Sequence, residues 1–280
     1  GIEVLLEACE NESHVDLVTN SLKALIPFAC SEIYRPQLGM AGGLDTFSSF
    51  LFSNQVDLKQ LGVFCLQNLL EYKSNREIFL GKHPEKSIEE NYVEVLAQLL
   101  PTVKKGVSES MKKMNRVQKR KEESEVGSLT PHDPFITRCI IHCFALISLE
   151  HDTEVQERLM AYNVPQLLYN LLHSEQIDKA SGESILLFFA EMLHGVHRVI
   201  ANLLKDPINM DCIPLLLSFH RIGSSNEHVG FRCLSALLSI SRSREFRSRV
   251  IVNLPELMNI IHVVINSTEE GKRTEHFYGT

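Results

Sequence analysis

The 280-residue sequence contains no tryptophan, and only 7% of its residues are aromatic. It also lacks an excess of basic residues, because 28 Lys and Arg stand against 35 Asp and Glu, a formal net charge of -7. Nucleic-acid binding proteins need a basic face to displace counterions from phosphates. The charge balance therefore argues against broad nucleic-acid binding.

Long apolar runs are missing as well, since a membrane-spanning helix needs roughly 18 consecutive apolar residues. The longest candidate, CIIHCFALISL from Cys139, is interrupted by His142. No secretory signal is recognisable. The number of cysteines, seven, is odd, and most of them lie within apolar helical patterns, which favours a reducing compartment. We expect a protein that does not insert into membranes and resides in the cytoplasm, with nuclear entry left open.

Motifs of the common enzyme classes are absent. The sequence has no G-x-x-x-x-G-K-[ST], no G-x-G-x-x-G, no H-E-x-x-H and no G-x-S-x-G. We therefore expect a protein that is not an enzyme, with no catalytic residues and no cofactor.

Cys139, His142 and Cys143 stand at positions i, i+3 and i+4, so one helix face could gather zinc ligands. The same segment holds several isoleucines and a phenylalanine, and small side chains such as cysteine are what close helix packing requires. We favour core packing for this group.

Glu191, His194 and His197 lie about one turn apart near a predicted helix end, where a metal could be held. Histidine is also favoured near the carbonyl groups that end a helix. We prefer this second interpretation, and no metal site is predicted.

A short phrase recurs along the chain at a regular spacing. Anchored on Cys65 of VFCLQNLL, related phrases contain Ala24, Cys143, Phe188 and Cys233, at successive intervals of 41, 78, 45 and 45 residues. Three intervals match one period of about 40 to 47 residues, and the interval of 78 is one period with an insertion or nearly two periods. The sequence therefore predicts a repeat architecture.

Each phrase belongs to a helix in which apolar residues fall three and four apart. A short helix and a second apolar helix precede it, and no segment reads as an alternating strand. Gly1 to Cys9 is expected to be a second helix, and 243–266 a last unit without a third helix. Pro27 is expected to bend its helix or end it early, because proline removes a backbone donor. The third helices are predicted at 14–30, 55–72, 133–150, 178–194 and 226–241.

This pattern resembles the armadillo repeat family, whose units run a short helix, then G-x-I-P-x-L-v-x-L-L, then A-L-x-N-L-S. The resemblance covers residues 1–266. It implies an all-α fold, a right-handed α-solenoid of about five to six armadillo-like three-helix repeats with partial first and last repeats. We predict one solenoid domain over 1–266, interrupted at 102–132, and a polar tail at 267–280.

Residues 102–132 carry eight Lys or Arg between Lys104 and Lys121 and few large apolar residues. This composition favours a solvated, flexible insert. The basic stretch could also fold on an acidic partner or serve as a nuclear-import signal. Its candidate contact residues are Lys112, Lys113, Arg116, Lys119, Arg120 and Lys121.

The resemblance also implies a concave groove lined by the third helices, in which the Asn of A-L-x-N-L-S and a Trp four residues earlier hold an extended peptide. The Asn positions here are Pro27, Asn68, Leu146, Glu191 and Ala236, and the Trp positions are Lys23, Phe64, His142, Leu187 and Arg232. Only Asn68 keeps its amide, so the usual ladder of amides is missing. The predicted groove residues are Lys23, Phe64, Asn68, His142, Glu191 and Arg232.

Among these residues Lys23, His142 and Arg232 are interpreted as contacts to acidic groups and Phe64 as an aromatic anchor. Each of them could equally be an ordinary surface residue between packed helices. The leading hypothesis is a non-catalytic scaffold or adaptor that binds a protein partner, either a peptide segment or a folded client. The alternative, which the resemblance suggests, is a regulator of an enzyme partner, such as a small-GTPase exchange factor or a chaperone-like cofactor.

Overall fold

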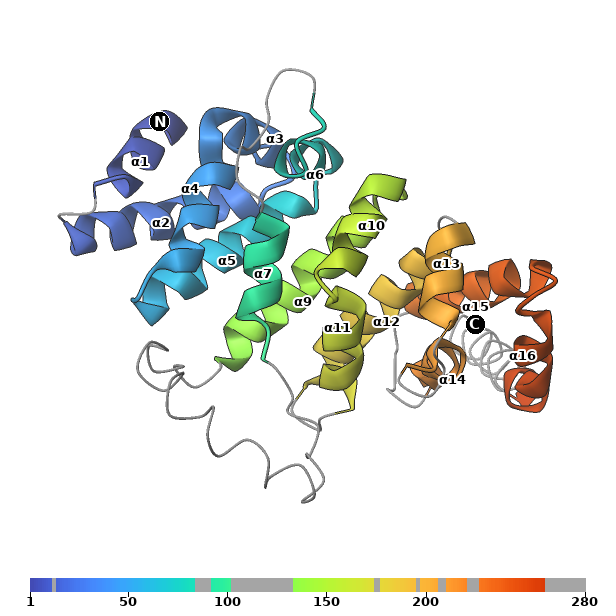
Figure 1. The fold of residues 1–280 in the computed structure, drawn as a ribbon. Helices are drawn as coiled ribbons and strands as arrows, with labels where there is room; N and C mark the ends of the chain where they lie inside the picture. Colours follow the sequence, from blue (N-terminus) through green and yellow to red (C-terminus); the bar gives the residue numbers. More distant parts are fainter. Residues whose placement is uncertain are drawn as a thin grey trace, which may run out of the picture. The chain divides into compact units, whose positions relative to one another are not determined.

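The computed structural model describes residues 1–11, 14–83, 92–101, 133–173, 177–194, 197–205, 210–220 and 227–259 (Figure 1). Within these ranges the regular structure is entirely helical. All five predicted third helices are present, each within two residues of its expected bounds. They are α2 (Val15–Cys30), α5 (Val56–Leu70), α9 (Pro134–Ser148), α12 (Lys179–His194) and α15 (Glu227–Arg242).

Shorter helices connect the third helices, as the repeat pattern predicted. Gly1 caps α1 (Ile2–Cys9), the expected second helix at the start of the chain. Across the described ranges, no helix is both long and apolar enough to cross a membrane. The other elements are α3 (Arg35–Leu38), η1 (Gly39–Gly43), α4 (Leu44–Ser49), η2 (Phe50–Phe52), α6 (Lys73–Phe79), α7 (Tyr92–Leu99), α10 (Thr153–Ala161), α11 (Val164–Leu172), α13 (His197–Leu204), α14 (Cys212–Leu217), η4 (Ser218–His220) and α16 (Arg247–Val252).

The chain divides into two compact units. The first comprises Gly1–Glu150 with Arg158–Ile177, and the second comprises His151–Glu157 with Asp178–Thr280. In the first unit α5 packs against both α2 and α9, and in the second unit α12 packs along α15 (Figure 1). Stacking of third helices within each unit is the arrangement that a repeat period predicts. The prediction of one domain over 1–266 remains a prediction, and the insert at 102–132 and the tail at 267–280 lie outside the described residues.

The apolar stripes of the third helices form the core of the first unit. Leu22 and Leu25 of α2, Leu66 of α5 and Phe144 of α9 are all completely buried. Burying one such side chain is worth about 1.5–3 kcal/mol relative to leaving it exposed. The i, i+3, i+4 spacing in the sequence therefore directly determines which helix faces meet.

Cys139 and Cys143 belong to this core, as the packing interpretation predicted. Burial raises the pKa of the Cys139 thiol to about 11 and the pKa of Cys143 well above its ordinary value. Because the thiolate is the reactive form of cysteine, both side chains are unreactive and serve in packing.

Two arginines, 41 residues apart, connect successive repeats of the first unit. Arg35 donates to the carbonyl groups of Ala29 (2.9 Å) and Cys30 (3.2 Å), which end α2. Its Nη1 also lies 2.6 Å from the carboxylate of Glu71, at the end of α5. Arg35 therefore caps one third helix and holds the end of the next.

Arg76 repeats this role one period later. It donates to the carbonyl groups of Leu70 (2.9 Å) and Glu71 (3.0 Å) at the end of α5, and its Nε lies 2.8 Å from Glu150 Oε1, just beyond α9. In the second unit Arg247 caps α15 in the same way, donating to the carbonyl group of Ser241 at 2.9 Å. The last carbonyl groups of a helix have no partner within the helix, so these arginines satisfy them.

The backbone at Gly39 comes very close to the side chain of Asn75 in α6. Asn75 is fully buried and donates from Nδ2 to the carbonyl groups of Arg35 and Leu69, at 3.0 Å each. A Cβ atom built on Gly39 would lie 2.0 Å from Asn75 Oδ1. A glycine is therefore required where these two repeats meet.

Pro27 does not shorten its helix, so this part of the expectation was wrong. Helix α2 runs from Val15 to Cys30 with Pro27 inside it. Only one intrahelical hydrogen bond is lost, and three further residues still extend the helix. The buried side chains of Leu22, Leu25 and Ala29 hold the last turn against the core.

Candidate functional site

An aromatic pair lies on two third helices of the first unit. The ring of Phe64 on α5 stacks on that of Phe135 on α9, with centroids 6.1 Å apart and planes inclined by 30°. Both side chains are partly exposed. The guanidinium carbon of Arg138, an exposed residue, lies 5.4 Å from the centre of the Phe135 ring, within cation–π range. We call these three residues the aromatic patch.

The start of α9 positions Phe135. Asp133 is the N-cap residue, and its Oδ1 accepts hydrogen bonds from the backbone N–H of Phe135 (2.8 Å) and of Ile136 (3.2 Å). Pro134 occupies the first turn, where proline is favoured. Gln60 of α5 donates to Asp133 Oδ2 at 2.7 Å and so ties the beginning of α9 to α5.

The other groove residues predicted in the first unit have different environments. Lys23 is exposed on α2, in keeping with a contact residue. Asn68 is only 8% exposed, and its Nδ2 donates to the carbonyl group of Phe64 at 2.8 Å. Its amide therefore bonds within its own helix and its donor is not directed at a ligand.

His142 is half-buried on α9. Burial lowers the pKa of its imidazole, and the negative charge of Glu71 opposes this effect only in part. A histidine with a lowered pKa is neutral at pH 7. This argues against a role for His142 as a cationic contact to acidic groups.

In the second unit the predicted groove residues Glu191 and Arg232 pair with each other. Arg232 Nη1 of α15 lies 3.4 Å from Glu191 Oε1 of α12, and His151 Nε2 lies 3.2 Å from Glu191 Oε2. Glu191 is only 1% exposed, whereas the Arg232 and His151 side chains are 36% and 45% exposed. Glu191 is therefore a buried anchor for the two side chains above it, not a direct contact to a ligand.

The geometry of this cluster leaves polar atoms without hydrogen bonds. Neither carboxylate oxygen of Glu191 has a hydrogen-bond partner among the described residues. The same is true of the buried Nε of Arg232. The ring of His151 also lies 5.9 Å from that of His194, the last residue of α12. A buried carboxylate is costly to the folded state unless cations pair with it. Arg232 therefore has a structural role, although its side chain is partly exposed.

No three His, Cys, Asp or Glu side chains gather as metal ligands in the ranges that the structure describes. The structure describes the backbone of His197 at the start of α13 but not its side chain, so the group Glu191, His194 and His197 is seen only in part. The six basic residues proposed within 102–132 also lie outside the described residues.

Phe135, Arg138 and His151 were not singled out from the sequence. Phe135 precedes His142 by seven residues, two helical turns, and Arg138 precedes it by four. This spacing places Phe135, Arg138 and His142 on one face of the helix. The periodicity of α9 could therefore have pointed to Phe135 and Arg138. His151 follows the end of α9 in a connecting segment, and no periodic signal marks it.

Comparison with known proteins gave matches only at the level of structure. No protein-family model matches the sequence, and no curated protein matches it. A designed armadillo repeat protein superposes with a TM-score of 0.65 at 14% identity, covering 92% of this chain and 91% of the other. The chain has the armadillo-repeat solenoid fold.

Two further structures share this armadillo fold. One belongs to computationally designed armadillo repeat proteins for modular peptide recognition, with a TM-score of 0.65, 15% identity, and coverage of 92% of this chain and 91% of that one. The other is a designed armadillo repeat protein in complex with the peptide (KR)4, with a TM-score of 0.52, 14% identity, and coverage of 91% and 98%. The all-α armadillo architecture that the sequence predicted is thus confirmed.

Proposed function

We propose that the chain is a non-catalytic scaffold that binds a segment of a protein partner on the third helices of its first unit. The observation that carries the proposal is the aromatic patch, in which the partly exposed rings of Phe64 and Phe135 stack and Arg138 lies over the Phe135 ring. Stacked aromatic side chains next to an arginine are typical of residues that dominate binding energy at interfaces. The fold supports the proposal, since designed armadillo proteins of similar structure have been made for peptide recognition.

The chemistry of the surface favours an acidic segment with a large apolar side chain. Lys23 and Arg138 are exposed cations on α2 and α9. Asp133 is engaged by Gln60 and by the backbone of α9, so its carboxylate is held by the protein's own donors. An apolar side chain of the partner would pack on the rings, and its carboxylates would approach the cations.

The amide ladder of peptide-transport armadillo proteins is not available to this chain. Asn68 donates within α5, and Glu191 is buried beneath Arg232 and His151. Recognition would therefore depend on the partner's side chains more than on its backbone. Sequence selectivity is the expected result, because contacts to side chains discriminate between partners.

Selection from a displayed library of short peptides against the purified chain tests the proposal. Enriched peptides should combine Asp or Glu with an aromatic or large aliphatic residue. Phe64→Ala should weaken the selected peptide by about 1–3 kcal/mol, measured by fluorescence anisotropy. The exposed Arg244→Ala is the matched control and should leave the affinity unchanged. Equal binding to Phe64→Ala and to the unmodified chain would refute the proposed surface.

A further inference from the structure

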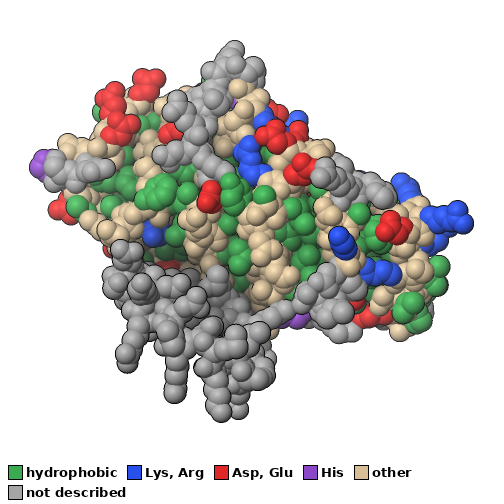
Figure 2. All heavy atoms as spheres, in the orientation of Figure 1, with side chains coloured by type: hydrophobic (Ala, Val, Ile, Leu, Met, Phe, Trp, Pro, Cys, Tyr) green, Lys and Arg blue, Asp and Glu red, His purple; other side chains and the backbone are tan. Residues whose placement is uncertain are grey.

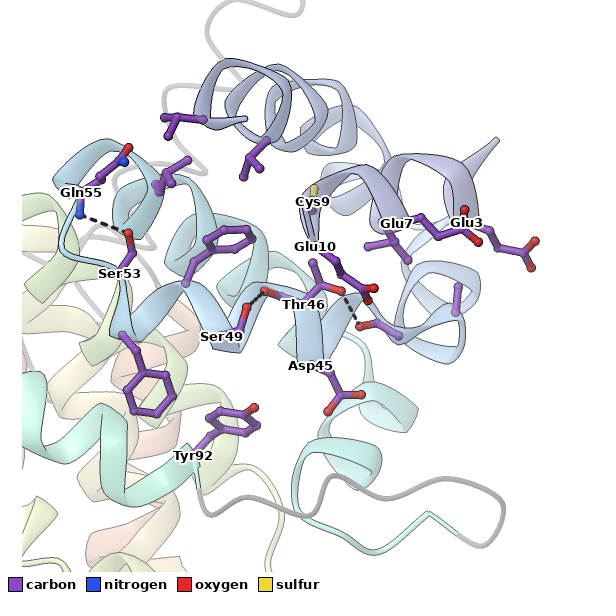
Figure 3. A pocket seen from close by; sticks show the side chains of 18 of the residues that line it. Glu3, Glu7, Cys9, Glu10, Asp45, Thr46, Ser49, Ser53, Gln55 and Tyr92 are labelled. Carbon is purple, nitrogen blue, oxygen red and sulfur yellow. Dashed lines mark hydrogen bonds between the residues drawn. The ribbon is translucent and has the colours of Figure 1, made fainter. Parts of the chain in front are cut away.

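A groove in the first unit lies apart from the aromatic patch. It has a volume of about 1010 Å³ and runs between α1 and α4, continuing to the loop that precedes α5 (Figure 3). None of the residues of the aromatic patch lines it. It is therefore separate from the surface to which the proposed function is assigned.

The floor of the groove is apolar. Leu6, Val18 and Leu58 line it and are at least nine-tenths buried, so they belong to the core. Phe52 also lines it and is 58% exposed, so its ring is accessible to a partner. An exposed aromatic ring in a groove offers a contact surface for a partner.

One wall of the groove is acidic. Glu3 and Glu7 lie on α1, Glu10 is its C-cap residue, and the three follow one another at positions i, i+4 and i+7; Asp45 lines the groove from α4. Figure 3 shows the three glutamates in a row, with Thr46 and Asp45 next to Glu10 in this view, and Figure 2 shows acidic side chains gathered over α1. Neither lysine nor arginine is among the described residues that line the groove.

The row of glutamates has no counter-charge among the described residues. Glu3, Glu7 and Glu10 are all exposed, and none of them makes an ion pair within the part of the chain that the structure describes. Like charges one turn apart on a helix repel each other. A cationic partner would relieve this repulsion, and a groove lined by one sign of charge concentrates ions of the opposite sign.

We propose that this groove docks a Lys- or Arg-rich segment of a partner protein. The apolar stems of the basic side chains lie against Phe52, and their charged ends reach Glu3, Glu7 and Glu10. This combination suits lysine and arginine, which bury their aliphatic stems while their charges stay near water, and whose cations favour aromatic faces. The inference goes beyond the proposed function because it concerns another surface and the opposite charge preference.

The probe for the test is a fluorescein-labelled peptide of alternating lysine and arginine, titrated with the full chain and followed by anisotropy. The triple substitution Glu3→Gln, Glu7→Gln, Glu10→Gln should weaken binding about tenfold, because each exposed charge pair contributes only a fraction of the affinity. Phe52→Ala should weaken binding as well, but by an amount that changes little with salt. Binding to the unmodified chain should weaken as the ionic strength rises.

A second triple variant, Glu32→Gln, Glu154→Gln, Glu245→Gln, removes the same charge from exposed positions that do not line the groove. It should bind the peptide like the unmodified chain. Equal weakening by both triple variants would overturn the proposal, because the peptide would then respond only to net charge. Failure of the unmodified chain and of every variant to bind the peptide would overturn it as well.

The chain's own basic residues between Lys104 and Lys121 are the competing occupant. Replacing the six basic residues of the insert named above with glutamine tests this directly. Unchanged binding of the peptide supports an external partner. Binding that is detected only after these replacements would overturn the assignment to a partner. The outcome is independent of the proposed function, since none of these variants alters Phe64, Phe135 or Arg138.

Discussion

Arg232 and Glu191 form an ion pair between α15 and α12, with Nη1 of the arginine 3.4 Å from Oε1 of the glutamate. The pair joins two positions that the armadillo resemblance assigned to peptide binding. Because the carboxylate is buried and the guanidinium partly exposed, the pair first stabilises the packing of the two helices. The second unit therefore differs from the first, where the equivalent surface presents aromatic rings.

Removing Arg232 should destabilise the second unit. Arg232→Met leaves the Glu191 carboxylate buried with His151 as its only remaining ion-pair partner among the described residues, and losing one partner of a buried pair typically costs about 3–5 kcal/mol. We expect about 2–4 kcal/mol here, because Arg232 is partly exposed. Urea denaturation measures the change. The double variant Arg232→Met, Glu191→Gln should recover much of the loss, and additive losses would contradict the inferred pairing.

Replacing Arg76 with alanine should lower the free energy of unfolding by about 2–3 kcal/mol. The substitution removes the cap of α5 and leaves Glu150 without its arginine. Arg76→Lys should restore little, since an ammonium group cannot bond two carbonyl groups and a carboxylate in this forked geometry. Thermal unfolding followed by circular dichroism provides the measurement, with the exposed Arg244→Ala as a control that should be neutral.

Gly39→Ala should destabilise the first unit by about 1–3 kcal/mol. The new methyl group would meet Asn75 Oδ1 at 2.0 Å, and Asn75 is held in place by its two hydrogen bonds. Asn75→Ala should cost stability by itself, and the double variant should cost less than the sum of the two single changes. A neutral Gly39→Ala in urea denaturation would show that the two repeats meet differently.

Six of the seven cysteines should react slowly with Ellman's reagent in the native protein. Cys30 is the exposed one, and the other six are buried. Burial raises the pKa of Cys9 and of Cys139 to about 11, and of Cys233 to about 12, so few thiolates exist at pH 8. One fast thiol is expected, and Cys30→Ser should abolish it. A fast reaction that survives Cys30→Ser would contradict the burial of the others.

Stability should fall as the pH drops below about 6.5, the ordinary pKa of histidine, in part because of His142. Burial lowers its pKa in the folded state, so the unfolded chain binds the proton more readily and is favoured in acid. His142→Gln should reduce this slope, measured as the urea midpoint between pH 7.5 and about 5. The exposed His14→Gln is the control and should leave the slope unchanged. The same slope in both variants would show that His142 is not the responsible group.

The helices were the most predictable part of the molecule. Their apolar spacing is a local property, which is why the bounds of α2, α9 and α15 followed from the sequence to within two residues. Pro27 misled the prediction of a shortened helix, because buried neighbours in α2 outweigh the loss of one hydrogen bond.

The candidate site was less predictable, because position within a repeat does not fix the exposure of a side chain. Asn68 and Glu191 share the same place in their repeats, yet one bonds to its own helix and the other is buried under two cations. Phe135 was missed because the armadillo motif directs attention to the middle of the third helix, whereas the capped start of α9 places this ring on Phe64.

The sequence by itself determined the helical class, the repeat period and the buried stripes, since these depend on the spacing of residues close together in the chain. Only the tertiary structure decided that Phe64 meets Phe135, that Arg76 joins α5 to Glu150, and that an acidic wall on α1 faces α4 across a groove. These relationships arise between segments distant in the sequence. They depend on how stacked helices bring side chains together, which no local pattern specifies.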